Sequence, residues 1–235
     1  MRAASGVPVG HSWIIAPAAG GAPFRTAQTL QADVALVDLE DSLAPELKQL
    51  GRERAEQIFT EPTAGAGTLG IRINPLTTVD GIRDLVAIER YVKKPEVILV
   101  PKVESAREVE VVAGCLDRAG HTPQIYALLE TPKGIEKASC VAKAERLAGL
   151  FFGPGDFARL LGCGLDWDTL LYARSRVVAS AAEAGLPALD GPFFDMEDLA
   201  GLRKEAEQGR ALGFFGKMAV APGQLPLITA VFRRT

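Results

Sequence analysis

The sequence predicts a (β/α)₈ barrel that forms a single domain over residues 1–235. Eight short apolar runs of strand length alternate with segments long enough for a helix. No low-complexity linker, charge block or heptad repeat divides the chain, and 235 residues is a common length for such a barrel. A doubly wound open sheet is the alternative architecture with this alternation.

The expected strands are mostly continuous apolar runs, as in parallel strands that are covered on both faces. The run at 34–37, Val-Ala-Leu-Val, is too short for a helix and ends at an acidic segment. Proline, glycine or a charged residue ends most of the other runs in the same way. The expected strands are 13–16, 34–37, 69–74, 97–100, 125–129, 150–152, 187–191 and 216–220.

Helix signals fill the intervals between these strands. Ser105 and Glu108 have the spacing of a capping box. Asp156 is expected to cap a short helix that carries Phe157 and Leu161. The expected helices cover about 23–31, 45 onward, 79–91, 105–119, 132–148, 156–161, 167–184, 195–212 and 222–235.

Composition excludes several classes of protein. The net charge of -3 and the lack of a basic stripe argue against nucleic-acid binding. No signal peptide and no apolar run of roughly 20 residues is present, so we expect no membrane association and a cytoplasmic location. Three cysteines and two histidines share no disulfide or zinc spacing. Any catalysis is therefore expected to use carboxylates, arginine and a metal ion.

A barrel enzyme places its active site at the carboxyl ends of its strands. Polar residues at those positions are therefore the candidates for chemistry. They are His11, Asp38, Glu40, Asp41, Arg72, Asn74, Lys102, Glu104, Glu130, Asp156, Asp190 and Lys217.

Glu130 and Asp156 are the candidate metal ligands. Each follows an apolar run and is accompanied by turn-forming or helix-starting residues. Two carboxylates delivered from neighbouring strand ends provide the hard oxygen ligands that Mg²⁺ prefers. The alternative for Glu130 by itself is a helix cap.

Arg72 is the candidate that binds anionic substrate oxygens. It lies between Ile71 and Ile73, and strand alternation places Arg72 and Asn74 together on the face toward the barrel interior or its mouth. A guanidinium there needs an anionic partner, which Glu40 could supply while leaving donors for a substrate carboxylate or enolate. The alternative is a core salt bridge that only closes the barrel.

The remaining charged strand ends have simpler alternatives. Acids before a helix, such as Asp38 and Asp41, often cap its free N–H groups. Lys102 and Lys217 could contact phosphate or carboxylate, or be solvated.

Together these segments resemble the HpcH/HpaI aldolase and citrate lyase beta-subunit family, closest to its citrate lyase beta-like branch. The similarity depends on several motifs in family order rather than on one decisive motif. The matching segments are 37–42, 71–75, 100–104, 129–134, 152–156, 172–175, 188–192 and 213–217.

The resemblance implies a lyase that cleaves a citryl-, malyl- or citramalyl-CoA-like thioester into a 2-oxo acid and an acyl thioester enolate. It also implies Mg²⁺ on Glu130 and Asp156, and a trimer or hexamer. In this scheme Arg72 binds the reacting oxygens, Glu40 orients Arg72, and Asp41 is a candidate for proton transfer. The candidate substrate-binding residues are Arg72, Asn74, Lys102 and Pro132.

The sequence also departs from the family pattern. His11-Ser12 replaces the usual Arg-Ser, and Ala221-Pro222 replaces the usual His-Pro. The chain ends at Thr235, whereas citrate lyase beta-like relatives continue into a segment that covers the active site; we expect that lid to be lacking. The alternatives are an aldolase acting on a free 2-oxo acid and an aldehyde, or a non-catalytic accessory subunit. The aldolases use a histidine after the second strand, and no histidine lies near Asp41.

Overall fold

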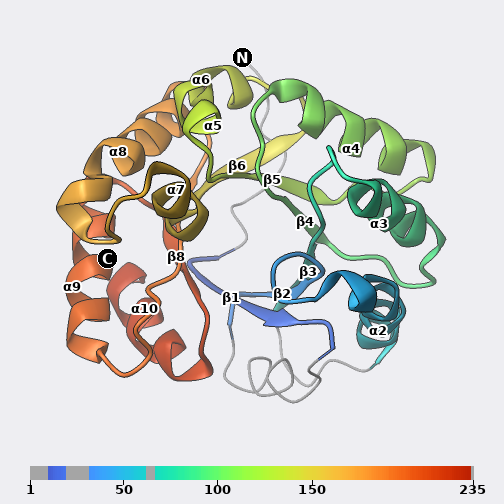
Figure 1. Cartoon of the computed structure of the whole chain (residues 1–235), viewed down its shortest axis with the longest axis horizontal. Coiled ribbons are helices and arrows are strands. Elements are labelled where there is room, and N and C mark those ends of the chain that lie inside the picture. The colour runs from blue at the N-terminus through green and yellow to red at the C-terminus, as the bar shows by residue number, and fades with distance from the viewer. Residues whose placement is uncertain (1–9, 20–31, 62–66, 234–235) are drawn as a thin grey trace.

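The computed structural model describes residues 10–19, 32–61 and 67–233, and there the chain forms a closed barrel of eight parallel strands (Figure 1). Each strand pairs with the next in sequence, and β8 closes on β1. The predicted (β/α)₈ barrel is therefore confirmed, and the open sheet is excluded. The strands are β1 (Ser12–Pro17), β2 (Val34–Asp38), β3 (Thr68–Arg72), β4 (Val97–Val100), β5 (Gln124–Leu129), β6 (Leu147–Phe152), β7 (Ala188–Asp190) and β8 (Gly216–Ala219).

The helices lie outside the strands (Figure 1). The one predicted at 23–31 falls outside the described residues. No helix in the described ranges has the length and apolar character that a membrane crossing needs. The helices are η1 (Pro45–Leu47), α2 (Lys48–Thr60), α3 (Val79–Arg90), α4 (Ala106–Arg118), α5 (Pro132–Glu136), α6 (Ala138–Val141), α7 (Pro154–Leu161), α8 (Trp167–Ala184), α9 (Leu199–Leu212), η2 (Pro222–Gln224) and α10 (Leu225–Phe232).

Two helix predictions were wrong. The helix predicted over 132–148 consists of the short α5 and α6, and Arg146 takes a left-handed conformation (φ 66°) just before β6, which a continuous helix does not permit. Asp156 does not cap α7. Gly153 occupies the cap position and Pro154 the first turn, so Asp156 lies inside the helix, where its carboxylate is free to pair with cations.

Side chains alternate between the barrel interior and the layer under the helices. The interior residues include Trp13, whose ring packs edge-on at 4.9 Å from both Tyr126 and Phe151. Gly70 leaves room for this packing, because a Cβ there would lie 2.6 Å from Leu36 Cδ2. The interior cluster is Trp13, Val34, Leu36, Val97, Leu99, Tyr126, Leu128, Phe151, Leu189 and Met218.

The side chains of Lys217 and Asp190 point away from the barrel interior, toward the helices, because their strand neighbours Met218 and Leu189 point inward. Lys217 Nζ is fully buried and lies 2.7 Å from Asp190 Oδ2 and 2.8 Å from Glu205 Oε1. Arg174 joins the same two acids at 3.2 Å each. The Lys217 ammonium is thus saturated under α8 and α9, which shows that it contacts no phosphate or carboxylate ligand in the cavity.

This buried network predicts a large stability effect. Replacing Lys217 with Met should lower the free energy of unfolding by about 3 kcal/mol, because Arg174 alone would then have to balance the charges of Asp190 and Glu205. Urea unfolding measures the loss. Arg203→Met on the exposed side of α9, where Arg203 lies 3.9 Å from Glu207, is the control and should change stability by under about 1 kcal/mol. An equal effect in the two variants would contradict the network's role.

Candidate functional site

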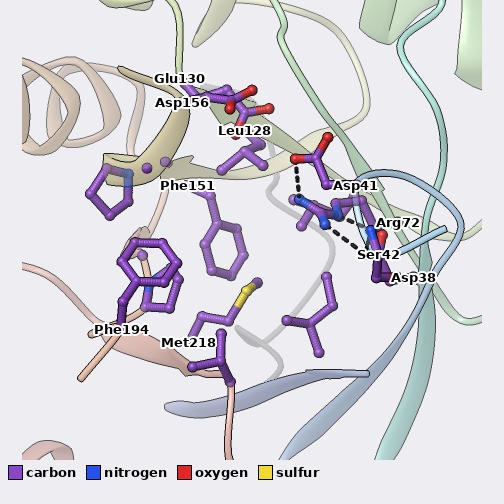
Figure 2. A pocket seen from close by; sticks show the side chains of 18 of the residues that line it. Asp38, Asp41, Ser42, Arg72, Leu128, Glu130, Phe151, Asp156, Phe194 and Met218 are labelled. Atoms are coloured by element: carbon purple, nitrogen blue, oxygen red, sulfur yellow. Dashed lines mark hydrogen bonds and ion pairs between the residues drawn. The ribbon is translucent and has the colours of Figure 1, made fainter. Parts of the chain in front are cut away.

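A cavity of about 520 Å³ opens at the carboxyl ends of the strands. Figure 2 shows that its charged and apolar residues lie on different sides, with Arg72 and the acids facing Phe151, Met218 and Phe194. The cavity is therefore amphipathic and could contact both a polar and an apolar part of one ligand. Its charged or hydroxyl-bearing lining residues are Asp38, Asp41, Ser42, Arg72, Glu130, Asp156 and Arg159.

Arg72 reaches this cavity because its side chain points toward the barrel interior. It lies two residues after Gly70 on β3, and alternate residues of a strand face the same side. Its register partner on β2 is Asp38, and the two side chains form a two-pronged pair: Nε to Oδ1 and Nη2 to Oδ2, each 2.7 Å. Asp38 also accepts backbone N–H groups of Glu40 and Ser42. Although burial opposes ionisation, the Arg72 charge and these hydrogen bonds hold the pKa of Asp38 below its usual value.

Glu40 also contacts Arg72, as predicted from the sequence, with 2.9 Å between Oε2 and Nη1. Asp41 is more distant, at 3.9 Å from the same nitrogen, and its side chain is 56% exposed. Asp38 is a residue of the candidate site whose pairing with Arg72 the sequence did not predict. The available signal was that both residues end their strands.

Lys102 joins the remaining acids. Its ammonium contacts Glu40 Oε1 and lies 2.9 Å from Asp156 Oδ2 and 3.6 Å from Asp41 Oδ1. Its backbone N–H donates to Glu130 Oε1 at 3.0 Å. Lys102 adopts φ 53°, an uncommon conformation for a residue other than glycine.

Glu130 is almost fully buried, and its carboxylate lies next to that of Asp156 (Figure 2). Burial, reinforced by the negative charges of Glu40 and Asp156, raises the pKa of Glu130 to about 8, despite the nearby cations. Asp156 behaves in the opposite way. Burial opposes its ionisation, but the contacts of its carboxylate with Lys102 and Arg159 lower its pKa below the usual value.

The charges around the cavity do not balance. Ionising all five acids against three cations leaves a formal excess of two negative charges, which equals the charge of one divalent cation. Burial is the main cause of the raised pKa of Glu130, and the negative charges of Glu40 and Asp156 add to it. The acids are Asp38, Glu40, Asp41, Glu130 and Asp156, and the cations are Arg72, Lys102 and Arg159.

The donor set fits Mg²⁺. Among the described residues, no group of three or more metal-ligating side chains is already assembled. Mg²⁺ does not need one, because it is usually held by one or two carboxylates and completes its shell with water and substrate oxygens. Asp156 Oδ2 is also buried without a hydrogen bond of normal geometry, although it lies close to Lys102. Glu130 and Asp156 are thus suited to share such a cation.

Three residues predicted to bind substrate do not line the cavity: Asn74, Pro132 and Lys102, whose ammonium is held by Glu40 and Asp156 instead. Asn74 lies beyond the end of β3, where strand alternation no longer applies, and its amide donates to Leu39 O at 2.9 Å and Asp84 Oδ2 at 2.7 Å. The inference that alternation directs Asn74 to the mouth was therefore wrong. Pro132 occupies the first turn of α5, outside the cavity lining.

His11 and Glu104 also lie outside the cavity lining. The prediction that His11 lies at a carboxyl strand end was wrong, because it precedes β1 and therefore lies at the amino end of that strand. His11 Nδ1 lies 2.6 Å from Phe215 O. Glu104 accepts a hydrogen bond from Thr131 and pairs with Lys133 at 2.8 Å. Both residues therefore have structural partners.

The sequence matches the HpcH/HpaI aldolase/citrate lyase family over residues 14–222. The (3S)-malyl-CoA thioesterase of Cereibacter sphaeroides is 35% identical over 211 residues, covering 89% of this chain and 72% of that protein. Citrate lyase subunit beta of Escherichia coli is 30% identical over 236 residues, covering 96% and 77%. The citrate lyase beta subunit from Mycobacterium tuberculosis, solved with oxaloacetate and magnesium, superimposes with a TM-score of 0.82 at 29% identity, covering 96% of this chain and 98% of that chain.

The raised pKa of Glu130 predicts a pH-dependent stability. In the folded protein the carboxyl keeps its proton up to about pH 8, whereas the unfolded chain releases it near 4.5. Stability from this group is therefore complete below pH 4.5 and is lost as the pH rises to 8. Glu130→Gln mimics the protonated carboxyl and should remove the loss, so that at pH 8 the free energy of unfolding of the variant should exceed that of the wild type by on the order of 4 kcal/mol.

Urea unfolding at pH 5 and pH 8 in the presence of a chelator measures this difference. Glu110→Gln, at an exposed acid on α4, is the control and should follow the wild type at both pH values. If the stability difference between Glu130→Gln and the wild type does not change with pH, Glu130 does not hold a proton at neutral pH.

Proposed function

Because the chain belongs to the HpcH/HpaI aldolase/citrate lyase family, we propose that it is a Mg²⁺-dependent carbon–carbon lyase acting on a 3-hydroxyacyl-CoA thioester. The substrate class is of the citryl, malyl or citramalyl type, and the products are a 2-oxo acid and an acyl thioester. One observation carries the proposal: Arg72 opens on the same cavity as the adjacent carboxylates of Glu130 and Asp156.

The reaction requires one proton removal and one bond cleavage. Loss of the proton from the 3-hydroxyl lets the C2–C3 bond break, so that C3 becomes the carbonyl carbon of the 2-oxo acid. The electron pair of that bond passes to the thioester fragment as an enolate. Protonation of its C2 then gives the acyl thioester. The protein must therefore bind a 2-oxo acid and stabilise an enolate.

Arg72 is suited to the enolate. The Arg72 guanidinium has five N–H donors, and two of them donate to the Asp38 carboxylate, which fixes the plane of the group. Glu40 contacts a different nitrogen, Nη1, of the same guanidinium. The other donors face Asp41 and the cavity, where they can stabilise developing negative charge. Asp41 is the candidate proton-transfer group, because it is exposed and lines the same wall.

Glu130 and Asp156 would hold the metal ion. When bound, Mg²⁺ supplies positive charge that polarises the oxygens of the 2-oxo acid fragment. The structure of the Mycobacterium tuberculosis relative with oxaloacetate and magnesium supports both the metal and the substrate class. The opposite wall, with Phe151, Met218 and Phe194, offers apolar contacts to the thioester fragment.

Thioester hydrolysis is a second candidate function, since the Cereibacter sphaeroides relative is named as a malyl-CoA thioesterase. Hydrolysis would add water to the thioester carbonyl and release a hydroxy acid and free CoA, without breaking a C–C bond. The free-aldehyde aldolase and the accessory subunit remain further alternatives. The products distinguish lyase, thioesterase and aldolase, and Mg²⁺ binding distinguishes these enzymes from an accessory subunit.

Incubating the protein with malyl-CoA, citramalyl-CoA or citryl-CoA and Mg²⁺ should give a 2-oxo acid and an acyl-CoA in equal amounts. Phenylhydrazone formation detects the 2-oxo acid, and a thiol reagent detects free CoA. Chelation should abolish turnover, and Glu130→Gln should abolish Mg²⁺ binding in calorimetry. Free CoA without 2-oxo acid would indicate hydrolysis, turnover of only free 2-oxo acid and aldehyde would indicate the aldolase, and absence of Mg²⁺ binding in the wild type would indicate an accessory subunit.

Arg72→Lys should separate substrate chemistry from metal binding. Lysine keeps the positive charge but cannot form the two-pronged pair with Asp38. We expect kcat to fall by about 100-fold or more, as for loss of a preorganised oxyanion donor, with Mg²⁺ affinity nearly unchanged. Arg107→Lys on exposed α4 is the matched control. Activity within a few-fold of the wild type would remove Arg72 from the mechanism.

A further inference from the structure

Lys102 contacts four acids of the site through two different groups. Its ammonium is shared among Glu40, Asp41 and Asp156, and its backbone N–H donates to Glu130. The ammonium therefore lies in the negative region where a divalent cation is proposed to bind. It bonds one of the two proposed metal ligands directly and holds the other through the main chain.

The backbone of Lys102 indicates that this arrangement is specific. A left-handed conformation disfavours residues with a Cβ, and it persists where surrounding contacts compensate for its free-energy cost. The next residue, Val103, donates its backbone N–H to Leu128 O at 3.2 Å, and Lys102 donates its own to the Glu130 carboxylate. The turn is therefore held by the last residues of β5 and by the residue that follows the strand. The side chain is 26% exposed, which leaves it room to move.

Two carboxylate oxygens near Lys102 lack a hydrogen bond of normal geometry. Asp156 Oδ2 and Glu40 Oε2 are buried without a hydrogen bond of normal geometry, although each lies 2.9 Å from a cationic nitrogen. Arg159 supports Asp156 through the other oxygen, Oδ1, at 3.0 Å. Oδ2 of Asp156 is thus held by an ion pair alone, a contact that a metal ion can replace.

We propose that Lys102 is the positioning residue of the acid cluster and acts as an internal counterion that gives up Asp156 when a divalent cation binds. In the metal-free protein its ammonium keeps Glu40, Asp41 and Asp156 together. On metal binding it keeps Glu40, which continues to orient Arg72, and leaves the Asp156 carboxylate to the metal. This inference rests on the proposed Mg²⁺ site on Glu130 and Asp156.

Lys102→Met tests the proposal by calorimetric titration with Mg²⁺ and by thermal unfolding. Because Lys102 competes with the metal for Asp156, its removal should lower the Kd for Mg²⁺ by about tenfold. Without Mg²⁺, the Tm of the variant should be about 5 °C below that of the wild type, because the carboxylates lose their shared cation. Mg²⁺ should then raise the Tm of the variant more than that of the wild type.

Lys133→Met is the matched control. It removes the same charge from a neighbouring lysine, whose Nζ lies 2.8 Å from Glu104 and contacts none of the four acids. Its Mg²⁺ Kd should stay near that of the wild type. A Kd in Lys102→Met that equals or exceeds the wild-type value would overturn the proposal, since a purely structural lysine would weaken metal binding.

The intact wild type provides a second measurement should Lys102→Met fail to fold. Acetylation by an amine-selective ester, followed by mass spectrometry, reports how freely each lysine reacts. Mg²⁺ should accelerate modification of Lys102 about threefold or more, because the ammonium loses one of its partners, and leave Lys133 unchanged. Unchanged or slower modification of Lys102 would overturn the counterion role. If the wild type binds no Mg²⁺, the proposed function fails together with this inference; if it binds Mg²⁺ normally, only the inference is at risk.

Discussion

The pairing of Arg72 with Asp38 is the interaction on which the candidate site depends. A guanidinium at the barrel mouth needs anionic partners, and Asp38 supplies one by both oxygens because the two residues are register neighbours at the ends of β3 and β2. Charge compensation then continues outward. Glu40 lies against Arg72, Lys102 against Glu40, and Lys102 reaches Asp156, which Arg159 also contacts. Among the described residues, Arg72 is the only cation paired with Asp38, so its removal would leave the buried Asp38 carboxylate unpaired.

Strand phase separates the roles of the ionic networks of Arg72 and of Lys217. Arg72 and Asp38 share the phase of the interior residues and meet in the cavity. Lys217 and Asp190 have the opposite phase and pair with Arg174 and Glu205 beneath the helices. Three of the segments that resemble the family, 172–175, 188–192 and 213–217, therefore contribute residues to a buried structural network. Motif similarity alone does not distinguish these residues from those of the cavity.

The two walls of the cavity suggest how one site could treat two fragments differently. The ionic wall has an excess of negative charge that favours a divalent cation, and the charges of Glu40 and Asp156 add to the effect of burial in raising the pKa of Glu130. The apolar wall, with Phe151, Met218 and Phe194, provides no ionic contact. A polar 2-oxo acid at one wall and a thioester chain at the other would satisfy both.

The sequence by itself determined the barrel, the positions of its strands, and Arg72, Glu130 and Asp156 as residues at strand ends. These follow from apolar runs of strand length and from where each run stops. Only the tertiary structure decided which strand-end residues face the cavity. Because most of these strands are buried on both faces, apolar residues fill both phases, and the sequence does not show whether Asp38 or Lys217 points inward. Asn74 was misplaced because β3 ends at Arg72, and the bridging role of Lys102 depends on a left-handed turn that joins acids distant in sequence.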